Sequence, residues 1–279
     1  MIRILRNLLI LLLFSAFPVL GVAQDFQFGP VDLPSLSAGD ETSVPREPSP
    51  DTSGLQDSSL PLLAHEQALQ LFQNQGQRQY AGLHGYTDDT LVIAELVDSS
   101  QRGAFELRRA FVAPRSLKYK PINYTGDTFV KSNVITRVLQ SEVDFVEKGD
   151  PAQTALSNAN YKFSYKGEQQ LDGHTAHVYQ VKPRHRRTGL FKGHIYLDAH
   201  TGSLLRSEGS IEKSPSFFVR KIEFVQDCMS VDDFTFPAHL HTTARARVLG
   251  KVVLDVYHRD YQPQPLSAAL SASHGDGGQ

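Results

Sequence analysis

Histidines gather in the second half of the chain, and two of them, His239 and His241, alternate along one predicted strand. Side chains two residues apart on a strand share a face, so these imidazoles could bind a divalent metal ion with Asp198 or His194 from a neighbouring strand. Two arginines farther along that strand would repel a cation, and the chain has neither paired cysteines nor a helical His-Glu-x-x-His. We therefore expect no metal and no cofactor, and a metal-dependent enzyme ranks third among the functions considered.

Nucleophilic and acid/base chemistry finds little support in the residue types and their spacing. Cys228 has no histidine or asparagine near it in the sequence, so we expect a packing residue rather than a nucleophile. The adjacent carboxylates Asp232 and Asp233 precede Phe234 in a turn-like stretch, which favours a hairpin turn over an acid/base pair. There is no Gly-x-Ser-x-Gly elbow and no glycine-rich phosphate loop between a strand and a helix. The sequence therefore predicts a protein that is not an enzyme.

A basic cluster surrounds a predicted connection between two strands after Pro183. From residue 160 to 261 the chain has 15 Lys and Arg against 11 Asp and Glu. Such a cluster is suited to anionic headgroups or to an acidic protein partner, and the alternative is a solvated loop. Nucleic acid is not expected, because the formal net charge is −2 and no aromatic platform accompanies the cluster. The candidate patch consists of Lys182, Arg184, Arg186, Arg187 and Lys192.

The elements that position these residues begin with a helix. Apolar residues recur at three- and four-residue spacing from Leu62 to Phe72, and Gly76 is expected to end this helix. Strands are predicted over 80–86, 90–97, 103–112 and 116–124, with Thr87-Asp88-Asp89 separating the first two. A second helix is predicted over 129–148, where an apolar stripe precedes Gly149-Asp150-Pro151.

From Asn160 onward the pattern is almost entirely that of antiparallel strands, with a hairpin signal at Asp172-Gly173. One face of each strand is apolar and the other polar, so the apolar face must be covered. The predicted fold class is mainly β (α+β), a curved antiparallel sheet or half-open barrel wrapped over two helices. The residues expected to line a cavity between sheet and helices are Ile195, Leu197, Leu240, Thr242, Ala244 and Leu254.

The chain ends show different compositions. Arg3 and Arg6 precede an apolar run, and small residues at 21 and 23 are typical of a secretory signal peptide over 1–23 that is cut after Ala23. Residues 24–60 are rich in Pro, Ser and acidic side chains, which favours a disordered linker. A single β-rich domain is expected over 61–261, followed by a loose tail over 262–279. These features predict an exported protein of the periplasm.

The β-rich half also resembles a known family. The strings GEQQLDGHTAHVYQVKP at 167–183 and GHIYLDAHTGSLLRSEG at 193–209, with KIEF at 221–224 and FPAHLHTT at 236–243, are similar to LolA-like domains. These are the periplasmic outer-membrane lipoprotein-sorting proteins and their relatives. The resemblance covers residues 160–261 and implies a curved sheet over helices, an apolar cavity for acyl chains, and no enzyme chemistry or metal.

Two functions follow from these observations. The first is a non-enzymatic periplasmic protein that binds a lipid, the acyl chain of a lipidated protein or another apolar ligand, with possible contact to a membrane surface. The second is an envelope protein-interaction or sensor module without a ligand, which docks a partner through its sheet edge or the basic loop.

Overall fold

The computed structural model describes residues 61–213 and 219–266. The predicted signal peptide (1–23), the linker (24–60) and residues 267–279 of the predicted tail lie outside the described residues. The helical elements are α1 (His65–Gly82), η2 (Val97–Ser99), α2 (Thr128–Val130), η3 (Lys131–Ile135, a π-helical turn), α3 (Thr136–Lys148) and η4 (Pro151–Gln153). The strands are β1 (Leu83–Leu96), β2 (Gln101–Val112), β3 (Ser116–Gly126), β4 (Tyr161–Leu171), β5 (His174–Pro183), β6 (Phe191–Asp198), β7 (Leu204–Ile211), β8 (Val219–Val231), β9 (Phe234–Ala246) and β10 (Gly250–Pro265).

All ten described strands belong to one antiparallel sheet with the order β3-β2-β1-β10-β9-β8-β7-β6-β5-β4. Neighbouring strands are consecutive in the chain except for β1 and β10, which pair from Leu83↔Pro265 to Leu96↔Val252. Strands β3 and β4 therefore lie at opposite edges of the sheet, roughly 43 Å apart at about 4.8 Å per strand. The connection between them has to cross a whole face of the sheet.

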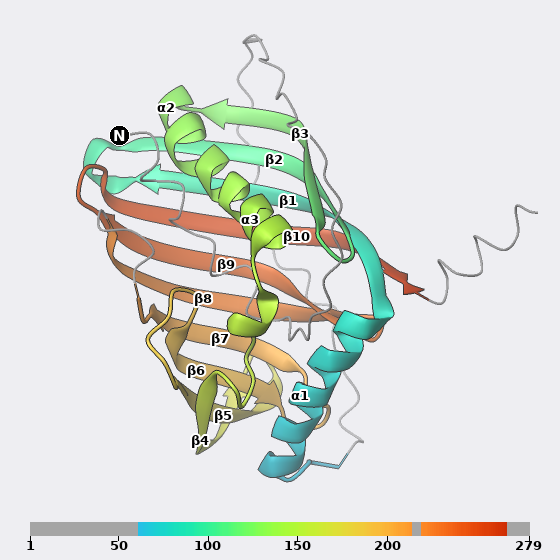
Figure 1. Cartoon of the computed structure of the whole chain (residues 1–279). Coiled ribbons are helices and arrows are strands. Elements are labelled where there is room, and N and C mark those ends of the chain that lie inside the picture. Colours follow the sequence, from blue (N-terminus) through green and yellow to red (C-terminus); the bar gives the residue numbers. More distant parts are fainter. Residues whose placement is uncertain (1–60, 214–218, 267–279) are drawn as a thin grey trace, which may run out of the picture.

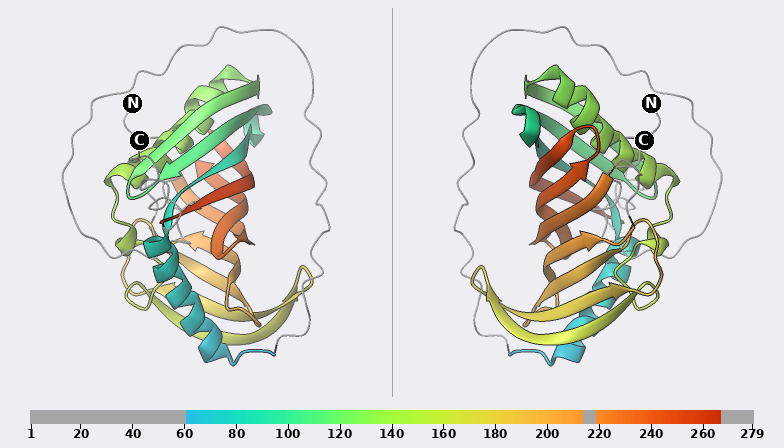
Figure 2. Two further views of the ribbon diagram at one scale, coloured as in Figure 1. Left: turned by 90° about the vertical axis from the view of Figure 1, so that its right-hand side faces the viewer. Right: turned by 90° about the vertical axis from the view of Figure 1, so that its left-hand side faces the viewer.

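Helices α2, η3 and α3 make this crossing, and α1 covers the other half of the same face (Figures 1 and 2). The crossing helix is amphipathic: Val134, Val138 and Val146 are buried against the sheet, whereas Lys148 and Asp144 form an exposed i,i+4 ion pair. The sheet curves around these helices (Figure 2). The predicted fold class, a mainly β protein with a curved antiparallel sheet over two helical segments, is confirmed.

Helix α1 is longer than the sequence predicted. It continues through Gly76 to Gly82, so the strand expected from Tyr80 begins only at Leu83. Gly76 is buried within this helix rather than ending it. Only Ala68, Gly76 and Gln79 are buried along this helix, which makes α1 a lightly packed cover.

The first two predicted strands are one strand, β1. The expected separation at Thr87-Asp88-Asp89 is only a bulge in the pairing with β10. Asp88 turns inward and is buried, where it forms an ion pair with Arg109 of β2. A polar run that resembles a turn can continue a strand when its inward carboxylate has a buried partner.

The remaining predictions from strand periodicity match the described elements closely. The helix predicted over 129–148 corresponds to α2, η3 and α3, and Asp172-Gly173 is the β4–β5 turn. Strand β10 continues to Pro265, beyond the expected domain end at Tyr261. Within the described ranges, no helix combines the length and the hydrophobicity required to cross a bilayer.

Candidate functional site

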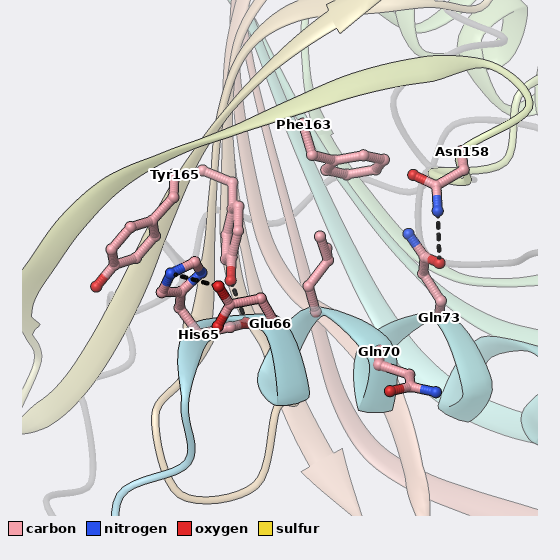
Figure 3. A pocket seen from close by; sticks show the side chains of 9 residues that line it. His65, Glu66, Gln70, Gln73, Asn158, Phe163 and Tyr165 are labelled. Carbon is pink, nitrogen blue, oxygen red and sulfur yellow. Dashed lines mark hydrogen bonds and ion pairs between the residues drawn. The ribbon is translucent and has the colours of Figure 1, made fainter.

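A groove of about 470 Å³ lies between α1 and the sheet edge formed by β4 and β5 (Figure 3). Its volume lies within the range of roughly 300–1,000 Å³ that is usual for ligand pockets. The sheet wall consists of Phe163 and Tyr165 from β4 and Tyr179 from β5. Leu69 lies in the helical wall, with polar residues along its rim. The complete lining is His65, Glu66, Leu69, Gln70, Gln73, Asn158, Phe163, Tyr165 and Tyr179.

Aromatic contacts and hydrogen bonds shape one end of this groove. The ring of His65 stacks on that of Tyr165, with centroids 3.9 Å apart. The hydroxyl of Tyr179 donates to the backbone oxygen of His65. Burial raises the pKa of Tyr165 and Tyr179, so both hydroxyls stay protonated at neutral pH. This end of the groove is an aromatic wall of two neutral tyrosines, with the carboxylate of Glu66 beside it (Figure 3).

The other end of the groove is closed by amides. Asn158 donates to the side-chain oxygen of Gln73 over 3.1 Å and links α1 to the segment before β4 (Figure 3). The groove offers mainly apolar contact with a few hydrogen-bonding groups, and its carboxylate is that of Glu66, which pairs with His65 over 3.0 Å. Such a lining suits an apolar chain with a small polar end better than a charged substrate.

The sequence did not single out this groove. Phe163 and Tyr165 alternate with Lys162 and Lys166, so the pattern predicted a strand but not that its aromatic face was partly open. The polar residues of α1 read as a solvated helix face. Two aromatic residues on the strand that ends a sheet are the one signal that could have indicated it.

The six predicted cavity residues all lie on the covered face of the sheet. Each is 5% exposed or less, and all but Thr242 belong to the main hydrophobic core. Ile195 of β6 pairs with Tyr179 of β5, which lines the groove, so the predicted cavity residues begin on the next strand of the sheet. The Oγ1 atom of Thr242 and the Oγ atom of Ser207 are buried without a hydrogen-bond partner among the described residues. The role of the six residues as ligand contacts stays a prediction.

The predicted basic residues lie at one end of the sheet. All five are exposed, with Lys182 near the end of β5, Lys192 at the start of β6 and the arginines in the loop between them. The Nε of Arg184 donates to the backbone oxygens of Asn158 and Tyr161, so this arginine also holds the loop in place. Arg186 and Arg187 project from the loop without such contacts.

His239 and His241 lie on the outer face of β9, where carboxylates engage their nitrogen atoms. Both histidines contact Asp255 Oδ1, at 3.0 Å and 2.8 Å. Hydrogen bonding with Asp227, and then with Asp255, raises the pKa of His239 to about 9. Of the two residues suggested as a further ligand, Asp198 accepts hydrogen bonds within the β6–β7 turn, and His194 lies 3.9 Å from Glu208. No group of three or more His, Cys, Asp or Glu that could hold a metal occurs among the residues the structure describes.

The candidate nucleophile and carboxylate pair have structural positions. Cys228 packs against the hydrophobic core, and burial raises the pKa of its thiol to about 12, so the thiolate needed for nucleophilic attack is not formed at neutral pH. Asp232 and Asp233 form the turn between β8 and β9, and Asp232 has a positive φ of 53°.

A buried polar cluster, which the sequence did not predict, lies under α3. The guanidinium of Arg109 contacts Asp88 over 2.7 Å, Glu142 of α3 over 3.1 Å and the hydroxyl of Tyr261 over 2.8 Å. His258 Nδ1 lies 2.9 Å from Asp88 Oδ2. Burial by itself raises the pKa of Asp88, but Arg109 and the bond with His258 lower it to about 2.

Burial raises the pKa of Glu142, although Arg109 and a hydrogen bond from Tyr119 oppose the shift. Each partner of Arg109 comes from a different element, so the cluster fixes α3 onto the sheet. Its charged members are all buried, and we assign it to the fold rather than to a ligand.

Comparisons with known proteins identify similar folds. No family model and no curated protein matches the chain. A putative outer membrane lipoprotein-sorting protein domain from Vibrio parahaemolyticus is similar at 14% identity with a TM-score of 0.39, covering 71% of this chain and 93% of that chain. A LolA superfamily protein from Nitrosomonas europaea is 7% identical with a TM-score of 0.35, and the match covers 73% of this chain and 95% of that chain. A chain of the MucA/MucB complex of Pseudomonas aeruginosa is 12% identical with a TM-score of 0.25, and the match covers 74% of this chain and 96% of that chain.

The resemblance that the sequence shows to lipoprotein-sorting domains thus appears again among solved structures. It is a likeness of fold, and what this chain binds depends on its own residues.

Proposed function

We propose that this protein is a non-enzymatic binding module of the periplasm, and that the groove between α1 and β4 takes an apolar chain such as the acyl chain of a lipid or lipoprotein. The observation that carries the proposal is the aromatic and apolar lining of the groove between α1 and the edge strands β4 and β5. Export through the signal peptide predicted over 1–23 is part of the proposal.

The packing of α1 supports entry of such a chain. The helix has only three fully buried residues, and its core contacts Leu69 and Phe72 are only partly buried, so it is less firmly packed than α3. Behind Tyr179 lie Ile195 and Leu197, which would continue an apolar path for a chain longer than the groove. The predicted cavity residues then act as the inner wall of the same site.

The test measures binding of a fluorescent long-chain fatty acid to protein purified without detergent. The chain has no tryptophan, so Leu69→Trp fills the groove and also reports on its surroundings. We expect Leu69→Trp to weaken binding at least tenfold, because the indole occupies the space of the ligand. Native mass spectrometry of the detergent-free protein should in addition show a co-purified acyl species.

The matched control is Val112→Trp, at an exposed apolar position 42% accessible to solvent and remote from the groove. This variant should bind like the unmodified protein. Equal binding by a folded Leu69→Trp variant, or protein that stays empty after incubation with envelope lipids, would contradict the proposal.

The second candidate is the protein-interaction module, and the free edge of β4 favours it. This strand ends the sheet, so no described strand pairs with its outer edge. Its aromatic residues line the groove, and an extended peptide that added beside β4 could place an apolar side chain there. Lys162 and Lys166 on this strand would hinder unspecific pairing.

Crosslinking from Gln169, an exposed position near the end of β4, separates the two candidates. A photoreactive residue there should capture a defined envelope protein if the edge is the binding site. Capture of such a protein by a chain that carries no acyl species would favour this second function.

A further inference from the structure

One end of the sheet carries an unusual concentration of positive charge, which extends well beyond the loop found in the sequence. Strands β5, β7 and β9 end here and β6, β8 and β10 begin here. We call this end the basic rim, and Figure 1 shows it on the left, opposite α1. Its exposed cations are Lys162, Lys182, Arg184, Arg186, Arg187, Lys192, Lys221, Arg245 and Lys251.

The strand register places like charges directly beside one another at the basic rim. Lys162 of β4 pairs with Lys182 of β5, and the pairing Val181↔Gly193 puts Lys192 next to Lys182. Three strands farther on, Arg245 of β9 pairs with Lys221 on one side and Lys251 on the other. Like charges directly opposite one another destabilise a sheet.

Few ion pairs among the described residues offset this repulsion. Lys221 has a partner in Glu223, at 2.6 Å. Lys162, Lys182 and Lys192 have no carboxylate within ion-pair distance in the described part of the chain. Two separate rows of cations that repel within the fold indicate an external anionic partner that spans several strands.

Exposed apolar residues accompany these cations. Val248, at the tip of the β9–β10 turn between the basic positions 245 and 251, is 68% exposed and is the most exposed of the large apolar residues described. Val97 of η2 and Phe129 of α2 are also exposed at this end. The backbone bond from Lys251 N to Asp98 Oδ2 holds η2 beside the β9–β10 turn. Apolar tips surrounded by Lys and Arg suit the headgroup region of a bilayer, where each side-chain type finds a favourable environment.

The opposite end of the sheet has a different charge. Its β4–β5 and β8–β9 turns carry Asp172, Asp232 and Asp233, while the exposed cations Arg115 and Lys118 lie at the β2–β3 turn and the start of β3. An anionic surface would attract the basic rim and repel the carboxylates of these two turns. This charge distribution favours an orientation with the basic rim toward the surface.

We propose that the basic rim is a docking surface for an anionic lipid bilayer, with Val248 in the headgroup region and the cations on the lipid phosphates. The proposal is independent of the groove, which lies at the side of α1 and can bind or fail to bind a ligand without affecting the rim.

Vesicle co-sedimentation of the purified full-length protein tests this inference. At low salt it should bind vesicles of phosphatidylcholine mixed with phosphatidylglycerol and not vesicles of phosphatidylcholine alone, and added salt should weaken binding. The double variant Lys182→Gln/Lys192→Gln should lose roughly 30-fold in affinity, since each cation near an anionic membrane contributes about fivefold. Its folding stability should be equal or higher, because a repulsion is removed.

The matched control is Lys118→Gln/Lys120→Gln, which removes the same charge from exposed positions of β3 at the other end of the sheet. This variant should bind vesicles like the unmodified protein. Val248→Trp, as the sole tryptophan, should show a blue shift in fluorescence with anionic vesicles. Absence of binding to anionic vesicles, equal loss in both double variants, or a complex with an acidic protein in place of vesicles would overturn the proposal.

Discussion

Arg109 is the residue on which the buried polar cluster depends. It is 1% exposed and lies between the carboxylates of Asp88 and Glu142, which come from β1 and α3. Removing one member of a buried charge cluster leaves the others uncompensated in a medium that solvates them poorly.

We expect Arg109→Gln to lower the free energy of unfolding by about 3–5 kcal/mol. The neighbouring Arg108 provides the control, because its pair with Asp89 is exposed on the arginine side. Arg108→Gln should cost less than about 1 kcal/mol. Urea unfolding followed by circular dichroism compares the two, and similar losses would show that the cluster does not have the assigned role.

His258 makes the stability of the fold depend on pH. Burial and the nearby charge of Arg109 lower the pKa of its imidazole from 6.5 to about 4. As pH falls from about 6.5 to about 4, the unfolded chain gains a proton that the folded chain does not bind, so the free energy of unfolding decreases. Above this range the imidazole is neutral in both states and its contribution is complete.

The difference between the two pKa values corresponds to roughly 3 kcal/mol. Urea midpoints measured across this pH range should therefore fall toward acid, and His258→Asn should flatten the dependence. His185→Asn, in the exposed loop before β6, should leave the slope unchanged. A slope that His258→Asn does not alter would assign the acid sensitivity to other groups.

At the scale of the elements, the contact between α1 and the β6–β7 turn determines how the helix covers the sheet. Gly202 has a φ of 73°, and a Cβ atom there would lie 2.8 Å from the backbone oxygen of Ala68. Gly173, in the β4–β5 turn, has a φ of 87° but nothing within 4 Å of such a Cβ atom. Both glycines have a positive φ, which favours glycine, but only Gly202 lies against helix α1.

Gly173→Ala should therefore cost about 1 kcal/mol, the strain of a left-handed residue. Gly202→Ala should cost more, because it also displaces α1, and it should weaken fatty-acid binding in the groove. Unfolding experiments and the fluorescent ligand measure the two effects. Equal stability losses with unchanged ligand binding would show that α1 tolerates the displacement.

The elements also show what could be predicted from the sequence. Strands with one buried face alternate regularly, so β4 to β10 and the crossing helix could be located from their apolar positions. The buried position of Asp88 could not be predicted, because a polar run in the sequence is typical of a turn. Only the tertiary structure shows that Arg109, on another strand, is the partner of this inward carboxylate. The groove depends on how far Leu69 stands from Phe163 and Tyr165, a tertiary distance that periodicity does not contain.

At the scale of the whole molecule, β10 joins two groups of strands. It pairs with β1 on one side and β9 on the other, so its removal would divide the sheet into three strands and six. Both groups would then expose unpaired edges that had been central, and α3 would lose part of the surface it covers.

A chain that ends after Ala246 should therefore lack a cooperative unfolding transition and be digested rapidly by protease. A chain that ends after Leu266 should behave like the full-length protein, because it retains all of β10. Thermal unfolding and limited proteolysis of both truncated chains provide the comparison. Cooperative unfolding of the shorter chain would show that the remaining nine strands form an independent unit.

The pairing of β1 with β10 also sets an order in time. Eight of the nine strand pairs join neighbours in the chain and can form as local hairpins, whereas this one joins the first strand to the last. Folding should therefore include a late closure step with a long loop, which is slow relative to hairpin formation. During synthesis, β1 to β3 must wait with one open edge until the end of the chain emerges. A circularly permuted chain that began at β4 and continued from β10 into β1 would be an uninterrupted meander, without this period of exposure.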